Sequence, residues 1–214
     1  MASPTIAAVP RPRRPLQGAS FAAGIVAWMV AVTAGFATLF RHSETPGAAG
    51  APPARWPSAS PVRLDAALPT LVLLAHPLCP CTAATIAELD RLMARCAGKV
   101  AATVLFYADP RLSPHWEQTD LWRHARRIPG VHAQADPMGE AARTFGAPTS
   151  GTVVLYAPSG RLLFHGGITA SRGHEGSNAG ATAILAIVTG DGAPPRTTAV
   201  YGCELRTPQS EGSR

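Results

Sequence analysis

Two cysteines separated by a single proline are the residues best suited to chemistry: Cys79 and Cys81, in the segment HPLCPCT. A short apolar run precedes them and a stretch with helical periodicity follows, so they lie where a strand leads into a helix. A thiol at a helix N-terminus meets unpaired backbone N–H groups and the positive end of the helix dipole, and both favour the thiolate. Because the thiolate is the nucleophile in disulfide exchange, the motif predicts thiol–disulfide chemistry at Cys79 and Cys81.

Pro80 supports this placement, since proline fits the first turn of a helix, where its missing N–H has no partner to lose. A disulfide between Cys79 and Cys81 closes a smaller ring than one in a C-x-x-C pair, and we expect it to be strained and readily reduced. The alternative for these residues is an inert structural disulfide or two buried thiols. Adjacent cysteines at a helix start are exposed and activated, which favours the reactive pair.

The other two cysteines have different surroundings. Cys96 lies on the apolar face of the predicted helix, which favours a packed core thiol. Cys203 lies near the C-terminus, in the segment YGC, where it either resolves a mixed disulfide at Cys79 or Cys81 or is a free tail thiol. The sequence leaves both roles open.

His76, three residues before Cys79, also has two interpretations. It assists proton transfer or ligates a metal, or it is only a polar strand end. Two soft thiolates and His76 form a copper(I) or zinc ligand set, so metal binding through Cys79, Cys81 and His76 is the main alternative to disulfide exchange. Disulfide exchange needs no cofactor, and copper is the cofactor of the alternative. No second ligand pair stands at zinc-finger spacing.

A strand–helix–strand unit positions the cysteine motif. The run TLVLLAH over 70–76 has strand length, and over 81–97 apolar residues recur three or four positions apart, as on one buried helix face. Gly98 ends this helix, and VAATVLFY over 100–107 forms a second strand. Two strands joined through a helix are parallel neighbours in one sheet.

Further helices and strands follow this unit. Ser113-Pro114 indicates the start of a helix that stops before Gly130, and a third strand is predicted over 131–135. Asp136 caps a short helix that ends near Phe145.

A hairpin and a helix end the folded part. Two apolar runs, 152–156 and 161–165, flank the turn residues APSG and predict the hairpin. A last helix over 179–188 ends at Gly190. The whole order predicts an α/β fold, with a central mixed sheet flanked by helices and a C-terminal β-hairpin and helix.

The N-terminus carries an uncharged apolar run over 21–40, which as a helix is long enough to span a bilayer core. A secretory signal peptide is the alternative, but its apolar region is shorter and ends at a small-residue cleavage site, whereas this run ends at Arg41. We therefore expect an uncleaved single-pass anchor in the inner, cytoplasmic membrane. Arginines before the helix keep the N-terminus cytoplasmic, so the rest of the chain lies in the periplasm or another extracytoplasmic compartment that permits disulfides.

Composition divides the chain into five parts. The Pro- and Ala-rich stretch after the anchor has few large apolar groups and predicts a flexible to semi-extended tether. The tail beyond Cys203 is polar, and we expect it to be frayed. The parts are a cytoplasmic basic N-terminus (1–20), a transmembrane helix (21–40), a linker (41–62), a folded domain (63–190) and a C-terminal tail with Cys203 (191–214).

The charge distribution argues against nucleic-acid binding. The 214 residues include 19 Lys and Arg against 13 Asp and Glu, a net charge of +6. The arginines are scattered, and the single cluster, before the apolar run, stands among prolines without aromatic neighbours. Such a cluster makes no groove for a nucleic-acid strand.

A strand, cysteines at a helix start, a β-hairpin and a final helix resemble the thioredoxin superfamily over about residues 64–190. The membrane anchor and the HPLCPC motif are similar to membrane-anchored bacterial redoxins of the RedB type. The resemblance implies a membrane-tethered thiol–disulfide oxidoreductase that acts on protein disulfides or thiols, with Cys79 as the nucleophile because the first cysteine is the more exposed in related proteins. The Cys-Pro-Cys spacing departs from the usual C-x-x-C, so the redox potential and the partner range do not transfer.

The resemblance also implies roles at two other places. The family puts a cis-proline immediately before the hairpin, facing the cysteines; here that position falls on Thr152, as in peroxiredoxin-like members in which a hydroxyl faces the reactive thiol. A threonine there argues against a cis peptide. The loop over 166–178 reaches the active-site surface in related folds. Its residues Arg172, His174 and Asn178 contact a partner or adjust a thiolate, or the loop only caps the last helix.

Two functions remain as alternatives. Membrane-tethered thioredoxin-like copper-delivery proteins resemble this architecture, but they space their cysteines by three residues and add a downstream histidine, and neither feature is cleanly matched. The second alternative is a non-catalytic binding protein on the same frame. The presence of both Cys79 and Cys81 argues against it, because reactive thiols are a hazard to a protein that does not use them.

Overall fold

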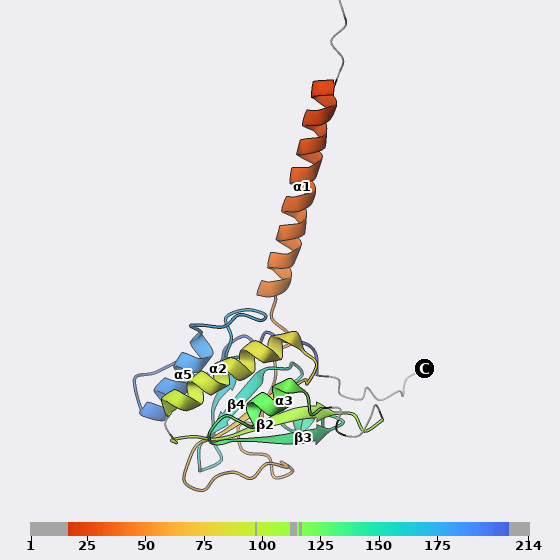
Figure 1. The fold of residues 1–214 in the computed structure, drawn as a ribbon. Helices are drawn as coiled ribbons and strands as arrows, with labels where there is room; N and C mark the ends of the chain where they lie inside the picture. The colour runs from red at the N-terminus through yellow and green to blue at the C-terminus, as the bar shows by residue number, and fades with distance from the viewer. Residues whose placement is uncertain (1–16, 97, 112–114, 116, 206–214) are drawn as a thin grey trace, which may run out of the picture. The chain divides into compact units, whose positions relative to one another are not determined.

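The structure, a computed structural model, describes residues 17–96, 98–111, 115 and 117–205. The chain divides into two compact units between Arg41 and His42. The second unit contains a five-stranded sheet with helices packed on it (Figure 1).

Helix α1, Gln17–Glu44, makes up the described part of the first unit and continues to the start of the second. By length and composition it is able to cross a membrane, and none of its apolar window is buried inside the protein. Phe21, Trp28 and Phe36 are among its exposed side chains. The structure therefore contains a helix over the predicted anchor segment.

The second unit has the element order βαβαβαββα. Its strands and helices are β1 (Thr70–Ala75), α2 (Pro80–Cys96), β2 (Ala101–Ala108), α3 (Asp120–Ala125), β3 (Val131–Pro137), α4 (Glu140–Thr144), β4 (Thr152–Tyr156), β5 (Leu162–Gly166) and α5 (Ala179–Thr189). The order of strands in the sheet is β3-β2-β1-β4-β5. Strands β1, β2 and β3 are parallel, and β4 runs antiparallel to both β1 and β5. The predicted mixed sheet, parallel pair and hairpin are confirmed.

Strand β1 lies at the centre of the sheet, and all six of its residues are buried. Because successive side chains point to opposite faces, a strand covered on both sides must be apolar at every position, as TLVLLA nearly is. Because β1 is the central strand, the turn that follows it, with the cysteines, lies at the middle of one end of the sheet.

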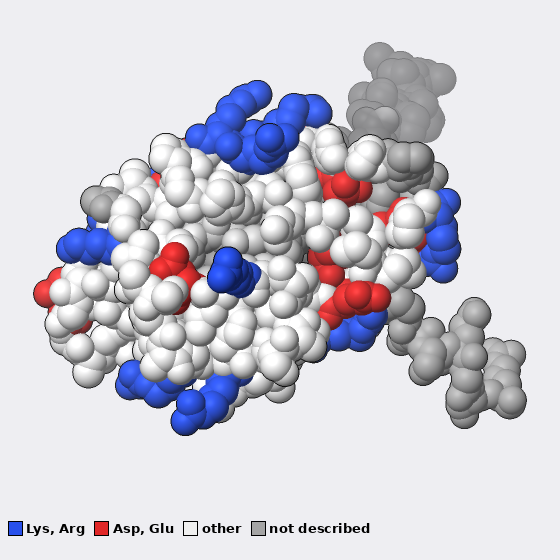
Figure 2. All heavy atoms as spheres, turned by 90° about the horizontal axis from the view of Figure 1, so that it is seen from below, with Lys and Arg blue, Asp and Glu red and all other residues white. Residues whose placement is uncertain are grey.

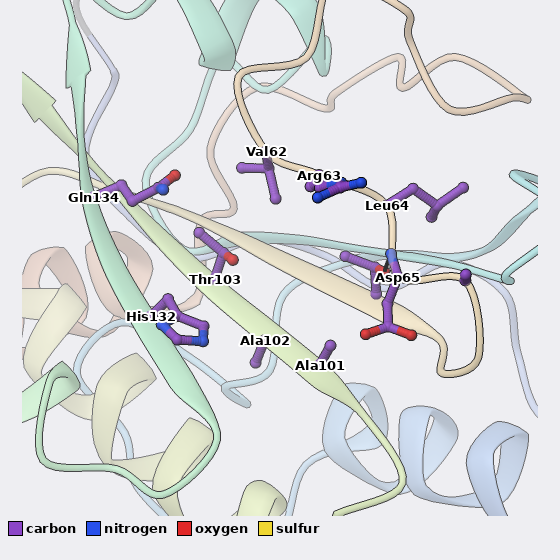
Figure 3. A pocket seen from close by; sticks show the side chains of 11 residues that line it. Val62, Arg63, Leu64, Asp65, Ala101, Ala102, Thr103, His132 and Gln134 are labelled. Carbon is purple, nitrogen blue, oxygen red and sulfur yellow. Dashed lines mark hydrogen bonds between the residues drawn. The ribbon is translucent and has the colours of Figure 1, made fainter.

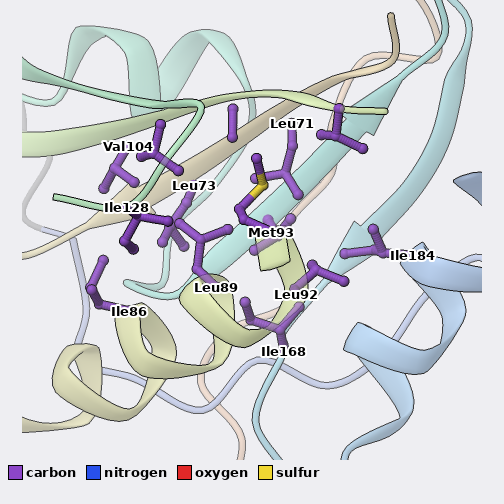
Figure 4. Close-up of a cluster of buried hydrophobic side chains, with 14 of the residues drawn as sticks. Leu71, Leu73, Ile86, Leu89, Leu92, Met93, Val104, Ile128, Ile168 and Ile184 are labelled. Atoms are coloured by element: carbon purple, nitrogen blue, oxygen red, sulfur yellow. The ribbon is translucent and has the colours of Figure 1, made fainter. Parts of the chain in front are cut away.

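The main core fills the face of the sheet on which α2, α3 and α5 pack (Figure 4). Leu71 and Leu73 of β1 point to this face, where they meet Leu89 and Met93 of α2. Their neighbours Val72 and Leu74 belong to a smaller core on the opposite face, with residues of α4. Cys96 is 1% exposed in the main core, which confirms the prediction of a packed thiol.

Two short helices differ in how well they were predicted. Helix α3 begins at Asp120, after Thr119, and is shorter than the predicted one; the predicted start at Ser113-Pro114 lies outside the described residues. Helix α4 begins at Glu140, later than a cap at Asp136 predicts, yet the Asp136 carboxylate, in β3, still accepts the backbone N–H groups of Ala141 at 2.7 Å and Ala142 at 3.0 Å. These are orphan donors of the first helical turn, so Asp136 satisfies them from outside the helix.

The linker is packed on the folded domain, so the prediction of a flexible tether is wrong. Trp56 packs edge-on against Phe145 and Tyr156, with ring centroids 5.4 and 5.2 Å apart. The Tyr156 hydroxyl donates to the Pro53 carbonyl at 2.8 Å, and the Leu162 N–H donates to Ala54 at 3.0 Å. One large aromatic residue in a Pro- and Ala-rich segment suffices to fix it, because an aromatic side chain buries a large apolar area at a low entropic cost.

The chain after α5 is also packed, so the boundary predicted at residue 190 is too early. We call residues 196–205 the C-terminal segment. The Arg196 carbonyl accepts from His165 of β5 at 3.0 Å, and at the other end the Leu205 N–H donates to Pro148 at 2.8 Å. The frayed part that the sequence predicts after Cys203 lies, from residue 206 on, outside the described residues.

Charged side chains occur in separate groups on the face drawn in Figure 2. Lys and Arg lie at several places along its edges and near its middle, with Asp and Glu interspersed among them. This distribution on one face agrees with the scattering of arginines in the sequence.

Candidate active site

Cys79 lies between β1 and α2, directly before the first helical residue, Pro80. The Cys79 carbonyl accepts the N–H of Thr82 at 3.0 Å, and its own N–H donates to His76 at 3.2 Å. A tight turn therefore leads from the strand into the helix. Pro80 occupies the first helical position, where it was expected because it has no N–H to satisfy.

The Cys79 sulfur receives several hydrogen bonds. The backbone N–H of Cys203 donates to it at 3.4 Å. Burial alone raises the pKa of this thiol, but hydrogen bonds from the Cys203 thiol and N–H, the Thr82 hydroxyl and the Cys81 N–H outweigh burial. The pKa of Cys79 therefore lies below its ordinary value, and the thiolate is the favoured form relative to a free cysteine.

Of Cys79 and Cys81, the cysteine with the lower pKa is not the more exposed one. Cys79 is only 2% exposed, whereas Cys81 is half-buried. The expectation that Cys79 is the more exposed cysteine is thus wrong. The reason is the C-terminal segment, which lies over Cys79 and which the motif alone does not reveal.

Cys81 is next to a positive charge from the loop after the hairpin. Burial and then the negative charge of Cys79 raise the pKa of Cys81, while a hydrogen bond from Arg172 and the charge of its guanidinium act in the opposite direction. The net pKa of Cys81 is raised. Arg172 also donates from Nη1 to the Gly202 carbonyl at 2.6 Å, so it joins Cys81 to the C-terminal segment.

Cys203 is held beside Cys79 by its neighbours in the C-terminal segment. The Cys203 carbonyl accepts the Ser150 N–H at 2.8 Å, and Thr149 and Glu204 form an antiparallel bridge. Gly202 lies so close to Ser150 that a Cβ at residue 202 would stand 1.9 Å from the Ser150 oxygen. Burial, followed by the hydrogen bond to Cys79, raises the pKa of Cys203 to about 12, so this thiol is protonated next to the Cys79 thiolate.

The hydroxyl that contacts the cysteine turn belongs to Ser150. Its Oγ lies 2.9 Å from the Thr82 hydroxyl and accepts the His76 N–H at 2.8 Å. Thr152, the predicted position, donates its hydroxyl to the Thr149 carbonyl at 2.6 Å. The alternation along β4 puts Thr152 on the face of Val154, which is the face away from α2. The described residues contain no cis peptide bond.

His76 does not join the two thiols in a ligand set. Its ring stacks on Tyr107, with centroids 5.7 Å apart, and its Nδ1 accepts the Leu78 N–H at 3.2 Å. Among the residues that the structure describes, no three His, Cys, Asp or Glu side chains are grouped to hold a metal ion.

The other two loop residues have different places. Asn178 caps α5, because its Oδ1 accepts the Ala181 N–H at 2.7 Å while its Nδ2 donates to Glu88 at 3.3 Å. Glu88 is buried in α2 and also accepts the Gly176 N–H at 2.6 Å. His174 is exposed in the same loop. The structure thus places Arg172 at the thiols, and Asn178 in the helix cap.

A polar groove of about 440 Å³ lies elsewhere, where the linker passes the end of the sheet at β2 and β3 (Figure 3). Arg63 and Asp65 line it from the linker side, and His132 and Gln134 from β3. None of its lining residues is a cysteine. The groove is separate from the thiols.

Sequence reasoning missed Thr82 and Ser150. Thr82 follows Cys79 by three residues, which is one helical turn, so its proximity has a local signal. Ser150 is 71 positions from Cys79 and has none. It becomes part of the site only because β4 pairs with β1 and brings the residues before β4 to the end of β1.

Comparisons with known proteins give similarities in fold. No protein-family model matches the chain, and no curated protein is similar to it in sequence. An uncharacterized conserved protein from Geobacillus kaustophilus is 19% identical with a TM-score of 0.56, over 78% of this chain and 95% of that one. A hypothetical protein from Sinorhizobium meliloti 1021 is 18% identical with a TM-score of 0.54, over 78% of this chain and 96% of that one.

A third solved structure is more distant. A secreted disulfide oxidoreductase from Mycobacterium tuberculosis is 13% identical with a TM-score of 0.42, over 59% of this chain and 84% of that one. Similarities at these identities concern the fold and carry no activity with them. The mixed sheet with strand order β3-β2-β1-β4-β5 and its flanking helices give this chain a thioredoxin-like fold.

Proposed function

We propose that the protein is a thiol–disulfide oxidoreductase, tethered to a membrane by α1, that exchanges disulfides with partner proteins outside the cytoplasm through Cys79 and Cys81. The observation that carries this proposal is the hydrogen bonding of the Cys79 sulfur at the start of α2, which lowers its pKa. The thiolate is the reactive species in exchange, so a lowered pKa makes Cys79 more reactive than an ordinary cysteine.

The exchange proceeds in two steps that conserve electrons. The Cys79 thiolate attacks one sulfur of a partner disulfide, forms a mixed disulfide and releases the other partner sulfur as a thiolate, which takes up a proton. Cys81, as the thiolate, then attacks the Cys79 sulfur and releases the second partner thiolate. Two electrons pass from the cysteine pair to the partner, and the reverse sequence oxidises a partner dithiol.

The surface around the pair supports a protein partner. Leu78 is 63% exposed directly before Cys79, and Pro80 is exposed between the two cysteines. Exposed apolar groups beside a reactive sulfur offer contact area to an unfolded or extended segment. Arg172 adds a positive charge that stabilises a thiolate at Cys81.

The anchor and the compartment belong to the same proposal. α1 is apolar over the length of a bilayer core, and by the positive-inside rule the arginines before it favour a cytoplasmic N-terminus. Disulfide exchange needs a compartment in which disulfides persist, and the extracytoplasmic side provides one.

A reductase assay on the full-length chain in detergent tests the proposal. The assay follows the reduction of a protein disulfide by dithiothreitol with and without the chain. We expect acceleration by the native protein, none by Cys79→Ser, and native rates for Cys96→Ala, the control at a core thiol. Full activity in Cys79→Ser contradicts the proposal.

A further inference from the structure

Cys203 is the one cysteine of the cluster for which the exchange mechanism has no use. It stands at the Cys79 sulfur, yet it is 124 positions away in sequence. The fold therefore brings Cys79 and Cys203 into contact. The contact serves either the stability of the fold or the chemistry of the two thiols.

We propose that Cys203 is the final redox partner of Cys79, so that the stable disulfide of the oxidised protein joins residues 79 and 203. The inference rests on the proposed function and deepens it, because it names the bond that stores the exchanged electrons. The disulfide between Cys79 and Cys81 is then an intermediate.

Distance supports this assignment. The Cys203 nitrogen is 3.4 Å from the Cys79 sulfur, and its Cα lies one N–Cα bond of about 1.46 Å further. The Cα of Cys203 is therefore within roughly 5 Å of that sulfur. The Cys203 thiol is itself hydrogen-bonded to the Cys79 sulfur, so the two sulfurs are already in contact and a modest side-chain rotation brings them to bonding distance.

The C-terminal segment holds Cys203 in this place from both sides. Its carbonyl accepts from Ser150, the preceding carbonyl of Gly202 accepts from Arg172, and Leu205 donates to Pro148. A side chain at residue 202 would collide with Ser150, so the segment passes there only as glycine. Cys203 is thus positioned as firmly as Cys79 is.

The bond between Cys79 and Cys81 is the weaker of the two. The Cys79 carbonyl already accepts the Thr82 N–H, so Cys79 belongs to the first turn of α2. The Cys81 thiol also contacts the Cys79 thiol through a hydrogen bond, but a disulfide across Cys-Pro-Cys closes a smaller ring than one in a C-x-x-C pair. A disulfide between them distorts the turn, whereas one between residues 79 and 203 joins two fixed backbones that already touch.

The transfer step conserves atoms and electrons. The Cys203 thiolate attacks the Cys79 sulfur of the 79–81 disulfide; the new S–S bond forms, the old one breaks, and Cys81 leaves as a thiolate. The proton lost by Cys203 passes to the Cys81 thiolate or to water. No oxidant is consumed, because this is an exchange within the chain.

Two charges favour this direction. Burial, the largest cause of the raised pKa of Cys203, persists, but the hydrogen bond to Cys79 and the negative charge of Cys79, which raise this pKa further, vanish when Cys79 enters a disulfide. The leaving Cys81 thiolate is stabilised by the hydrogen bond and charge of Arg172. A leaving thiol departs faster the lower its pKa is, so Arg172, which acts against the raised pKa of Cys81, promotes release of Cys81.

Peptide mapping of the full-length protein tests the proposal, and trypsin is suited to it. Cys79 and Cys81 fall in one tryptic peptide, 64–91, Cys203 falls in 197–206 and Cys96 in 96–99. The protein is equilibrated in glutathione redox buffer in detergent, free thiols are blocked with N-ethylmaleimide in acid-quenched, denatured samples, and the digest is analysed by mass. A link between 64–91 and 197–206 is distinguished by mass from a loop within 64–91.

We expect the linked peptide in the oxidised native protein and in Cys81→Ser, and its loss in Cys79→Ser. Cys203→Ser is expected to show the loop within 64–91 instead, reduced at least tenfold more readily, which is about 30 mV in midpoint potential. Cys96→Ala is the matched control and keeps the native pattern. The key result comes from the native protein, so it does not depend on how any variant folds.

Other outcomes overturn the inference in distinguishable ways. A loop within 64–91 and a blocked Cys203 thiol in the oxidised native protein overturn it and leave the proposed function intact. The same holds for a link to 197–206 that disappears in Cys81→Ser and persists in Cys79→Ser. If all four thiols stay free across the buffer series, both the inference and the proposed function fail.

Discussion

Two segments bring thiols to the same point by different means. The turn before α2 carries Cys79 and Cys81 as neighbours in sequence, and a strand, a proline and a helix start suffice to place them. The C-terminal segment carries Cys203, which reaches Cys79 only through contacts with Ser150 and Arg172. The local motif thus supplies the reactive groups, whereas the long-range contact lowers the pKa of one of them, Cys79.

This difference also explains why Cys79, the cysteine with the lower pKa, is less exposed than Cys81. Both thiols lie at the helix start, yet only the pKa of Cys79 is lowered, because the donors from Cys203 act on Cys79 and cover it at the same time. Cys81 stays half-buried and depends on Arg172 instead. The comparison predicts that changes in the turn abolish chemistry, while changes in the C-terminal segment tune it.

The largest expected effect is the loss of the turn nucleophile. We expect Cys79→Ser to reduce disulfide reduction roughly a thousandfold or more, to the background without protein, because a serine hydroxyl is not ionised at neutral pH. The measurement is the initial rate of reduction of a protein disulfide, with Cys96→Ala as the control. A rate within a factor of about two of native would show that the turn is not the reactive region.

Gly202→Ala tests the contribution of the C-terminal segment, because it should displace this segment from Ser150. A Cβ at residue 202 would lie 1.9 Å from the Ser150 oxygen. Overpacking of this kind costs about 1–3 kcal/mol, so the opening equilibrium of the segment should rise by roughly 5- to 150-fold. The readout is the rate at which N-ethylmaleimide labels Cys203 in the native, reduced protein.

Thr197→Ala, at an exposed position of the same segment, serves as the control for Gly202→Ala. We expect it to leave labelling of Cys203 unchanged. Equal labelling in both variants and the native chain would show that the contact with Ser150 does not hold the segment.

Cys203→Ala and Cys203→Ser separate the hydrogen bond from the thiol. Cys203→Ala removes the side-chain donor to the Cys79 thiolate, so the Cys79 pKa rises and alkylation below that pKa slows. Hydrogen bonds to charged groups contribute about 1.5–3 kcal/mol, so we expect a decrease of about tenfold near neutral pH. Rates converge at high pH, where Cys79 is a thiolate in every variant.

Cys203→Ser keeps an O–H donor and should restore most of the native alkylation rate. The measurement is the iodoacetamide rate constant of Cys79 against pH, by mass spectrometry. A native profile in Cys203→Ala would mean that Cys203 does not stabilise the thiolate.

The smallest expected effect is at Arg172. Arg172→Met removes the guanidinium that lowers the pKa of Cys81, so the raised pKa of Cys81 rises further and its alkylation near neutral pH falls. We expect about a threefold to tenfold decrease, since the charge is partly exposed. Arg172→Lys keeps the charge but loses the planar guanidinium. We expect its Cys81 alkylation rate to lie between those of the native protein and Arg172→Met. An unchanged alkylation rate of Cys81 in Arg172→Met would show that Arg172 does not stabilise the Cys81 thiolate.

Local patterns predict much of this molecule. The hairpin strand over 152–156 was predicted to the residue, and α2, β2 and α5 differ from prediction by a residue at either end. Asp136 was predicted to cap α4, and its carboxylate accepts N–H groups of that helix. In each case the signal is periodicity, a turn residue or a cap, and all of these act over a few positions.

Other features depend on tertiary contacts. The linker was predicted to be flexible from its Pro and Ala content, but Trp56 finds Phe145 and Tyr156 about 90 and 100 positions later. Ser150 and the burial of Cys79 follow from the pairing of β4 with β1 and from the course of residues 196–205. No pattern within a short window of sequence contains that information.

Redox titration of the full-length protein tests the central claim most directly. The chain in detergent is equilibrated with dithiol buffers of graded potential, free thiols are counted by mass after alkylation, and copper is measured on the same samples. We expect one two-electron transition in the native protein and in Cys96→Ala, and its loss in Cys79→Ser. No transition at any potential, with copper bound at about one ion per chain, would contradict thiol–disulfide exchange as the function of this site.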